Sequence, residues 1–415
     1  MTNDNQHLPA GYKPSPLGPI PEDWEVKRLG DCFEVSAGRD LEKDYFSPTK
    51  TERHCYPVFS NSLENKGLYG YTSRPRHKGN SITITGRGSL GHAEYRTEDY
   101  DAIIRLLVLT PKIEISCKLI SDYINATSPF IYESTGVPQL TAPQIINTKL
   151  LLPPYKEQKK LVVILQLWDT AIEKQTALTE QLTLRKRGLM QQLLTGKKRL
   201  KGFSGEWKEV RLGEVFYERN ETNCDDLPLL SITGDKGVIY QSESDKRDIS
   251  NEDKSKYKRI CPNDIGYNTM RMWQGRSALS ELEGIVSPAY TIVTPKESVD
   301  ARFMAMLIQQ PRIVYSFWTH SQGLVSDTLN CKYPDFSQVK VTIPPKDEQT
   351  AVAEFLIGLN KEIELANKKL ASLQAQKKGL MQVLLTGKRR INQQHSYAMI
   401  EIETLHGKPD SHLNH

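Results

Sequence analysis

Two regions of the sequence place cationic, amide and aromatic side chains in or beside glycine-containing loops, and these residue types suit contacts with DNA. Arginine, asparagine and glutamine can hydrogen-bond base edges through two atoms at once, and lysine and arginine also bind phosphates. Charged loops with glycine are equally ordinary on protein surfaces, so composition alone does not decide. The candidate DNA-binding residues of the first region are Tyr69, Tyr71, Arg74, Arg76, Lys78 and Arg87. Those of the second region are Asn268, Arg271, Trp273, Gln274 and Arg276.

Short motifs that imitate catalytic or nucleotide-binding signatures lack the residues that those chemistries need. The segment LPPY at 152–155 imitates the base-binding motif of amino-methyltransferases, but it begins with leucine instead of a polar residue. Gly196-Lys197 and Gly387-Lys388 lack the earlier glycine and the following Ser or Thr of a P-loop. Pro334-Asp335 has no acidic-x-Lys partner of the nuclease kind. We therefore predict no catalytic residue, no metal site and no cofactor-binding site in this chain.

An internal repeat organises the elements that must position the candidate loops. The segment 152–200 recurs at 343–391 with a constant offset of 191 residues and no gap. Both copies begin with Pro-Pro-x-x-Glu-Gln and end with Leu-Leu-Thr-Gly before a basic cluster. A shorter pair, WEVKRLGDCF at 24–33 and WKEVRLGEVF at 207–216, precedes each diverged block. The chain is thus two tandem units, each a diverged block followed by a shared one.

Each shared block is predicted to be a long helix. Pro154 and Pro345 suit the first turn, and the Thr-Gly exits suit glycine C-caps. Apolar residues of the second copy, from Val352 through Phe355 and Leu359, recur at spacings of three, four or seven, whereas Gln175 interrupts the first copy. About 37 residues make a helix on the order of 55 Å long. We expect the two helices to form an antiparallel coiled coil; the alternative is that each packs on its own domain as an ordinary amphipathic helix.

The diverged blocks contain short β-rich runs separated by Gly, Pro, Asn and Asp, such as SITIT and AYTIVT, and helical stretches such as ISCKLISDYIN. This pattern predicts two tandem domains of mixed α/β (α+β) class with substantial sheets, related by a pseudo-twofold repeat and separated by the long helices. The predicted boundaries are a tail at 1–16, a first domain at 17–151, a central helical spacer at 152–200, a second domain at 201–342, a distal helical spacer at 343–391 and a flexible C-terminal tail at 392–415.

Composition limits the partners and the compartment. Lys and Arg total 55 against 50 Asp and Glu, which gives a net charge of +5, so any basic surface must be local. The six cysteines occur singly, without a Cys-x-x-Cys pair or a zinc-type cluster, which is typical of reduced thiols in the cytoplasm. No apolar stretch approaches the ~18 residues that cross a bilayer. We expect a cytoplasmic protein that does not associate with membranes.

The repeated motifs resemble those of the specificity (S) subunits of type I restriction-modification systems. The matching elements are the entrance LGPIPEDWEVKRLGD, the Pro-Pro-x-x-Glu-Gln helix starts and the ending KxGLMQxLLTGK, which occurs twice. TGRGSLG in the first block and PNDIGYNT in the second are similar to segments of that family's target-recognition domains. The resemblance covers nearly the whole chain except its two ends.

The resemblance implies a subunit without catalysis of its own. Each target-recognition domain would bind one half of an asymmetric bipartite site in duplex DNA. The paired helices would set the spacing and dock two methyltransferase (M) subunits, and motor-nuclease (R) subunits would join them. S-adenosylmethionine, ATP and Mg²⁺ would belong to those partners. The basic clusters 197–199 and 388–390 would contact phosphates, or would only complement the helix dipole.

Two other functions remain open at this point. A structural scaffold would use the coiled coil to bridge two domains that bind proteins instead of DNA. A specificity subunit from a related system, such as a bifunctional restriction-methylation enzyme, would share the fold but serve a different effector. Salt-dependent binding to duplex DNA would separate the scaffold from the two DNA-binding alternatives.

Overall fold

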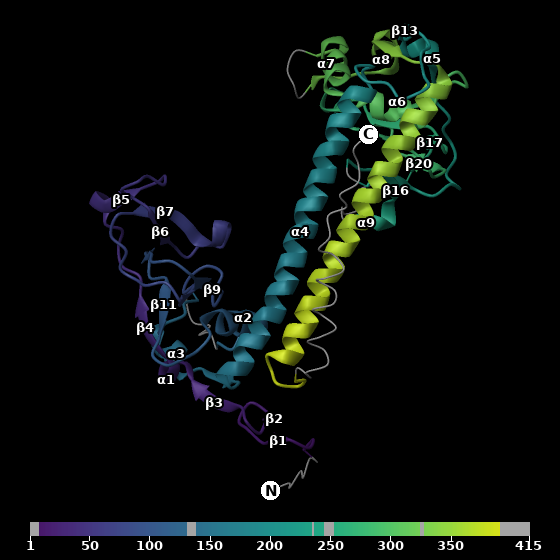
Figure 1. The fold of residues 1–415 in the computed structure, drawn as a ribbon. Helices are drawn as coiled ribbons and strands as arrows, with labels where there is room; N and C mark the ends of the chain where they lie inside the picture. Colours follow the sequence, from purple (N-terminus) through teal and green to yellow (C-terminus); the bar gives the residue numbers. More distant parts are fainter. Residues whose placement is uncertain (1–7, 131–137, 235, 245–252, 324–327, 391–415) are drawn as a thin grey trace. The chain divides into compact units, whose positions relative to one another are not determined.

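The computed structural model describes residues 8–130, 138–234, 236–244, 253–323 and 328–390 (Figure 1). The chain forms two compact units, of which the second is a continuous stretch of sequence and the first is not. The first unit comprises residues 1–175 and 369–415, and the second comprises residues 176–368. Each unit therefore contains one diverged domain, the start of the helix that follows it and the end of the other long helix. This division cuts across the linear boundaries that the sequence predicted, and the predicted tail at 392–415 lies outside the described residues.

The two long helices have matching bounds, α4 at Tyr155–Leu193 and α9 at Lys346–Leu384. Both helices end before a glycine with a left-handed backbone, Gly196 (φ 70°) and Gly387 (φ 69°), which confirms the predicted glycine C-caps. The backbone N–H two residues after each glycine closes the last turn of the helix. Lys198 N donates to Gln192 O at 3.2 Å, and Arg389 N donates to Val383 O at 3.1 Å. No helix in the described ranges is long and apolar enough to cross a membrane.

In the first unit, two four-stranded sheets carry the diverged domain, in the orders β10-β6-β7-β5 and β4-β11-β8-β9. The ribbons β1-β2 and β12-β3 complete the unit. Its strands are β1 (Tyr12–Lys13), β2 (Ile20–Pro21), β3 (Glu25–Arg28), β4 (Phe33–Ala37), β5 (Phe46–Ser47), β6 (Tyr56–Phe59), β7 (Leu68–Thr72), β8 (Ser81–Ile84), β9 (Ala93–Arg96), β10 (Asp101–Ala102), β11 (Leu107–Pro111) and β12 (Lys149–Leu152). Its further helices are α1 (Leu29–Cys32), η1 (Lys43–Tyr45), η2 (Glu64–Gly67), α2 (Cys117–Thr127) and α3 (Ala142–Asn147).

In the second unit, one four-stranded sheet, β14-β21-β18-β19, is accompanied by the ribbons β15-β16, β17-β20 and β13-β22. Its strands are β13 (Lys208–Arg211), β14 (Phe216–Arg219), β15 (Leu230–Ile232), β16 (Val238–Tyr240), β17 (Lys258–Ile260), β18 (Ile265–Asn268), β19 (Ser277–Leu279), β20 (Gly284–Val286), β21 (Tyr290–Pro295) and β22 (Lys340–Ile343). Its further helices are α5 (Leu212–Val215), η3 (Gln241–Glu243), η4 (Met272–Gln274), α6 (Ala301–Ile308), α7 (Pro311–His320) and α8 (Tyr333–Gln338).

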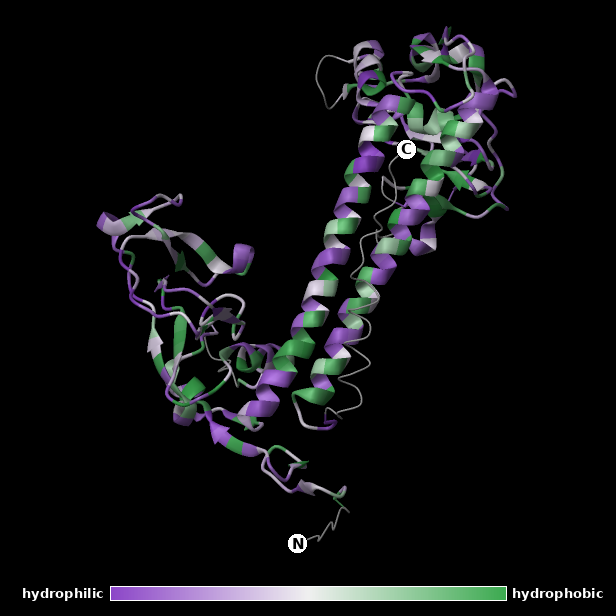
Figure 2. Cartoon of the chain, viewed as in Figure 1, coloured by the Kyte–Doolittle hydropathy of each residue, from purple (hydrophilic) through white to green (hydrophobic). Residues whose placement is uncertain are grey.

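The long helices pair in antiparallel fashion within each unit. In the first unit, Leu161 near the start of α4 shares a buried core with Leu384 at the end of α9. In the second unit, Leu193 at the end of α4 shares a core with Val352 near the start of α9. Apolar residues recur in patches along both helices (Figure 2). Because these cores also contain residues of the diverged domains, each helix packs on a domain as well as on the other helix.

This double packing explains where the predicted coiled-coil seam was wrong. Phe355, assigned to the seam, is 37% exposed, whereas the neighbouring Leu356 is completely buried. Gln175, taken as an interruption, is buried as well. The buried face of each helix must serve a domain in addition to the partner helix, so it departs from a regular heptad stripe.

Candidate nucleic-acid interface

In the second unit, the candidate residues belong to the single loop that joins β18 to β19. Asn268 ends β18, and its Oδ1 accepts a hydrogen bond from Met270 N at 3.0 Å. Trp273 Nε1 donates to Met270 O at 2.9 Å, so the indole braces the turn. Gly275 has a φ of 73°, which ends the short helix η4 and returns the chain to β19. The loop is thus shaped by its own hydrogen bonds.

This loop borders two hollows in the surface of the second unit. Asn268, Arg271 and Arg276 line a cavity of about 620 Å³, together with Thr233 and Tyr290. Gln274 and Arg276 also line a neighbouring hollow of about 580 Å³, beside α7. The side chain of Arg276 makes no hydrogen bond or ion pair with any described residue. The Arg276 guanidinium thus borders both hollows without a partner among the described residues, an arrangement that suits a ligand with base edges or phosphates.

In the first unit, an aromatic and cationic surface forms on strand β7 and the segment after it. Tyr69 is half-exposed, and its ring centroid lies 5.6 Å from that of Phe46. The Arg74 guanidinium stacks 3.8 Å above the Tyr45 ring, and Lys50 Nζ lies 6.0 Å from the Tyr71 ring centroid. Such stacking orients the cations while leaving their donors able to bind a further partner.

Arg76 has a different environment, because a buried carboxylate of the same unit already binds its guanidinium. Arg76 Nε and Nη2 donate to the two carboxylate oxygens of Asp101 at 2.6 and 2.7 Å, and Asp101 is buried. Hydrogen bonding to Asp101 raises the pKa of Arg76. Its assignment to DNA stays a prediction, but the bidentate ion pair gives this side chain a structural role that competes with it.

Lys78 and Arg87 occupy more exposed positions. The Lys78 side chain is 85% exposed, and its Nζ lies 2.8 Å from Asp99 Oδ2. Arg87 lies in the exposed loop between β8 and β9, where its Nη2 donates to Gln139 Oε1 at 3.3 Å. Since β7 and β8 belong to different sheets, the candidates of the first unit are spread over two sheets and their loops, and those of the second unit are gathered in one loop.

The residues that the sequence did not reveal are supplied by other elements of the same unit. Tyr45 and Phe46 support the cations and tyrosines of the first unit, and Thr233 and Tyr290 wall the cavity of the second. Their contacts depend on strand pairing, as between β5 and β7 at Ser47 and Tyr71. No local sequence signal marks such long-range neighbours.

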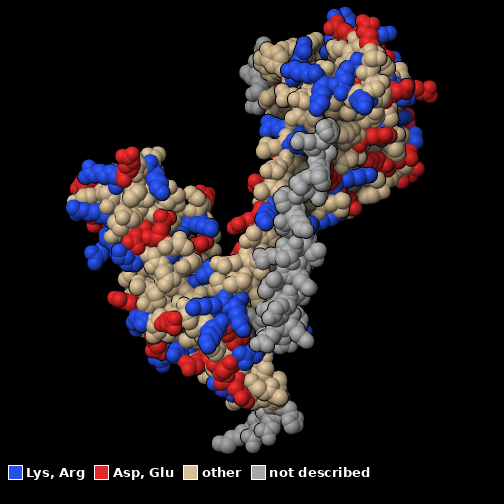
Figure 3. All heavy atoms as spheres, in the orientation of Figure 1, with Lys and Arg blue, Asp and Glu red and all other residues tan. Residues whose placement is uncertain are grey.

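The basic clusters after the long helices also have partners within the protein. Arg199 Nε donates to Glu348 Oε1 at 2.9 Å, and Arg390 Nη2 donates to Glu157 Oε2 at 2.6 Å. These two arginines are therefore bound within the protein, and phosphate contact by Arg389 and the lysines of the two clusters stays a prediction. On the face shown in Figure 3, Lys and Arg are interspersed with Asp and Glu and do not form one continuous basic surface.

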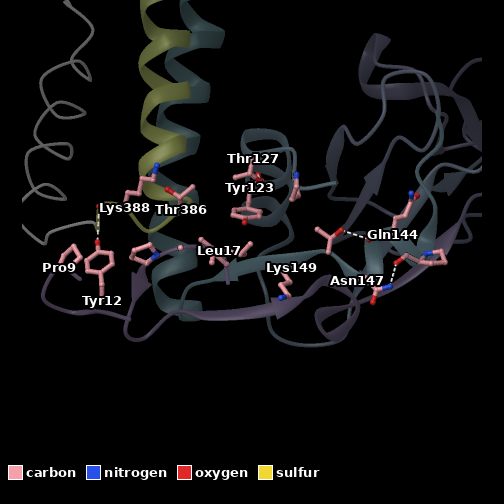
Figure 4. Close-up of a pocket in the computed structure, with 16 residues that line it drawn as sticks. Pro9, Tyr12, Leu17, Tyr123, Thr127, Gln144, Asn147, Lys149, Thr386 and Lys388 are labelled. Carbon is pink, nitrogen blue, oxygen red and sulfur yellow. Dashed lines mark hydrogen bonds between the residues drawn. The ribbon is translucent and has the colours of Figure 1, made fainter. Parts of the chain in front are cut away.

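A cavity of about 1150 Å³ in the first unit is lined by Lys388 of the second basic cluster, but by none of the candidate residues of the glycine-containing loops (Figure 4). Its walls include Tyr12, Tyr123 and Lys149, and Tyr12 Oη donates to Gly387 O at 2.9 Å. Among the described residues, no group of three or more His, Cys, Asp or Glu side chains is placed to hold a metal ion.

Comparisons with known proteins agree with this architecture. The model of the type I restriction modification DNA specificity domain matches the chain twice, at residues 21–184 and 204–375. A putative type I restriction enzyme MjaX specificity subunit from Methanocaldococcus jannaschii is 24% identical over 92% of this chain and 97% of its own length.

Two solved structures share the fold. The S subunit of a type I restriction-modification system from M. genitalium aligns with a TM-score of 0.53 and 14% identity, over 86% of this chain and 95% of its own. A chain from a structural study of complex assembly and conformational transition of the type I R-M system aligns with a TM-score of 0.56 and 15% identity, over 89% and 99% of the two chains.

Proposed function

Because the chain belongs to the family of type I restriction-modification DNA specificity proteins, we propose that it selects the DNA site on which the other subunits of such a complex act. The observation that carries the proposal is the combination of a repeated frame with two unlike polar surfaces. The loop at 268–276 offers arginine, asparagine and glutamine around a cavity, whereas the surface on β7 offers tyrosines and stacked cations. Two unlike surfaces would bind two unlike half-sites.

The recognised site would therefore be bipartite and asymmetric. Each recognition domain would bind one half of it, and the bases between the halves would not be contacted specifically. On a pseudo-twofold frame the half-sites would lie about one helical turn apart, roughly 34–36 Å centre to centre, on one face of the duplex. Direct hydrogen bonds in the major groove would supply the base specificity.

The outward faces of the long helices would dock two methyltransferase subunits that modify adenine. Leu184 on α4 and Leu365 on α9 support this, because these large apolar side chains are 67% and 66% exposed. Motor-nuclease subunits would join for cleavage. The chain itself would perform no chemistry, so S-adenosylmethionine, ATP and Mg²⁺ would act in the partner subunits.

We place this activity in the cytoplasm, where the DNA and the partner subunits would be. The six cysteines support a reducing compartment, because all of them are free thiols.

Binding to duplex DNA across a series of salt concentrations tests the proposal. The full chain with its methyltransferase partner should bind genomic duplex fragments with an affinity that falls steeply as salt rises, because each neutralised phosphate releases condensed counterions. The logarithmic slope should be about −0.9 for each phosphate contact. Affinity that is weak and independent of salt would contradict the proposal and favour a scaffold that binds proteins.

A further inference from the structure

The Gln of each Pro-Pro-x-x-Glu-Gln motif joins the start of a long helix to a helix of the recognition domain. Gln158 is 2% exposed; its Nε2 donates to Pro153 O at 2.9 Å, and its Oε1 accepts from Ser116 N at 2.8 Å. Ser116 is the N-cap of α2. One amide group therefore holds the first turn of α4 against the first turn of α2.

The second unit repeats this arrangement atom for atom. Gln349 is 1% exposed; its Nε2 donates to Pro344 O at 2.8 Å, and its Oε1 accepts from Asp300 N at 3.0 Å. Asp300 is the N-cap of α6. The two recognition domains have diverged in sequence, yet both present the N-cap of a helix to the same glutamine.

The preceding Glu of each motif holds the end of the other long helix. In the first unit, Glu157 accepts from Arg390, which follows α9, and from Trp24 Nε1 at 3.1 Å. In the second unit, Glu348 is buried and accepts both Nε and Nη2 of Arg199, which follows α4. Adjacent residues thus connect three elements: the long helix that carries them, the domain helix and the end of the opposite long helix.

We propose that each Pro-Pro-x-x-Glu-Gln motif is a joint that fixes the orientation of a recognition domain on the helical frame, with Gln158 and Gln349 as positioning residues. This inference rests on the proposed function, because the orientation of the two domains decides which separation of half-sites both can contact at once. A rigid joint restricts the subunit to one spacer length. A loosened joint lets a domain tilt and accept half-sites displaced by one base pair.

The physical basis is the two-point attachment of a planar amide. The bond to Pro153 O or Pro344 O fixes the amide on its own helix start, so that the second bond, from the N-cap of the domain helix, is made at a fixed distance and angle. An apolar side chain of the same volume would fill the same space without directional bonds. Burial strengthens the constraint, since a buried backbone N–H or C=O that loses its partner costs free energy.

The test is methyl transfer by the purified complex to DNA duplexes that carry both half-sites at the natural spacer and at spacers one base pair shorter or longer. The half-sites are first identified from methylated genomic DNA. The variants are Gln158→Met and Gln349→Met, which keep side-chain volume and remove both hydrogen bonds. Matched controls are Ile82→Val and Ile292→Val, one buried core substitution in each unit.

We expect the preference for the natural spacer to fall between about twofold and tenfold in each Gln→Met variant, the range that corresponds to one ordinary hydrogen bond. The valine controls should keep the wild-type preference even where their thermal stability falls. Glu157→Gln keeps Gln158 and weakens the pair with Arg390, so it should relax the preference in the same direction by a smaller factor. Glu157→Gln also provides a test of the joint if a Gln→Met variant does not fold.

Two outcomes would overturn the inference, and they distinguish failure of the joint from failure of the proposed function. If the wild-type complex methylates gapped sites but the joint variants keep its spacer preference, the joint is structural only. If the wild-type complex methylates no gapped site, the proposed function fails and the joint fails with it.

Discussion

The two units of this chain hold their recognition domains in the same way and present different surfaces from them. In both, a buried glutamine bridges the long helix to a domain helix, and a glutamate binds the arginine after the opposite helix. The candidate DNA-binding residues are not arranged alike in the two units. In the second unit they lie in one loop, and in the first unit they are distributed over two sheets and their loops. The repeat has therefore kept the parts that hold a domain, while the parts that would meet DNA have diverged.

The largest effect is expected on protein stability, where Arg76 should differ from the other candidate DNA-binding residues. Arg76→Ala would leave the carboxylate of Asp101 buried without its bidentate partner, and we expect a loss of about 3 kcal/mol in the free energy of unfolding. Urea denaturation measures it. Arg276→Ala, the matched control in the second unit, should change stability by less than about 0.5 kcal/mol. Equal stability of the two variants would remove the structural role that competes with DNA binding by Arg76.

The second effect concerns base discrimination by the second unit. Arg276 lines both hollows, so Arg276→Ala should reduce discrimination by about tenfold to a hundredfold at one base position of one half-site, the range for a bidentate contact. Methylation of duplexes with single-base changes in either half measures it. Arg74→Ala is the matched variant in the first unit and should alter the other half only. A loss at both halves in either variant would show that the two units do not each bind one half-site.

A smaller effect distinguishes the two joints by pH. Burial opposes ionisation of Asp300, but hydrogen bonds and charge from Arg302 and the helix N–H groups outweigh it and lower the pKa of Asp300. A lowered pKa contributes stability above the ordinary carboxylate range, and this contribution is lost as pH falls through the folded-state value. The corresponding Ser116 does not titrate in this range.

Asp300→Ser gives the second joint the N-cap of the first. We expect it to lose at most about 1 kcal/mol at neutral pH, and to approach wild-type stability as the solution becomes acidic. Urea midpoints across the acid range, with Ser116→Ala as the control without a titrating group, measure the difference. A difference in urea midpoint between Asp300→Ser and wild type that is the same at every pH would show that Asp300 does not contribute stability through a lowered pKa.

The smallest effect is expected at Lys78. This side chain is almost fully exposed beside Asp99, so Lys78→Ala should leave the urea midpoint unchanged. If Lys78 binds a phosphate, the variant should weaken DNA binding equally across sequences and reduce the logarithmic salt slope by about one. An unchanged slope would remove Lys78 from the candidate interface.

Features with a local cause were predictable from the sequence. The helix bounds follow from proline, glycine and apolar spacing, and the left-handed Gly196 and Gly387 stand where the Thr-Gly exits placed them. The ion pair of Arg76 with Asp101 was not predictable, because strand pairing brings distant residues together. The prediction that Phe355 lies in the coiled-coil seam was wrong for a related reason. The helix also packs on a domain core, and the spacing of its own apolar residues does not show where that contact lies.

We propose that this chain directs methylation to a DNA site composed of two unlike halves. Single-molecule sequencing of methylated DNA tests it most directly, comparing cells that express the chain with its methyltransferase and cells that lack only this chain. We predict that an asymmetric, gapped motif with methylated adenine disappears with the chain. An unchanged methylation pattern, in cells whose methyltransferase is active, would show that this chain does not direct methylation and would favour the protein-binding scaffold.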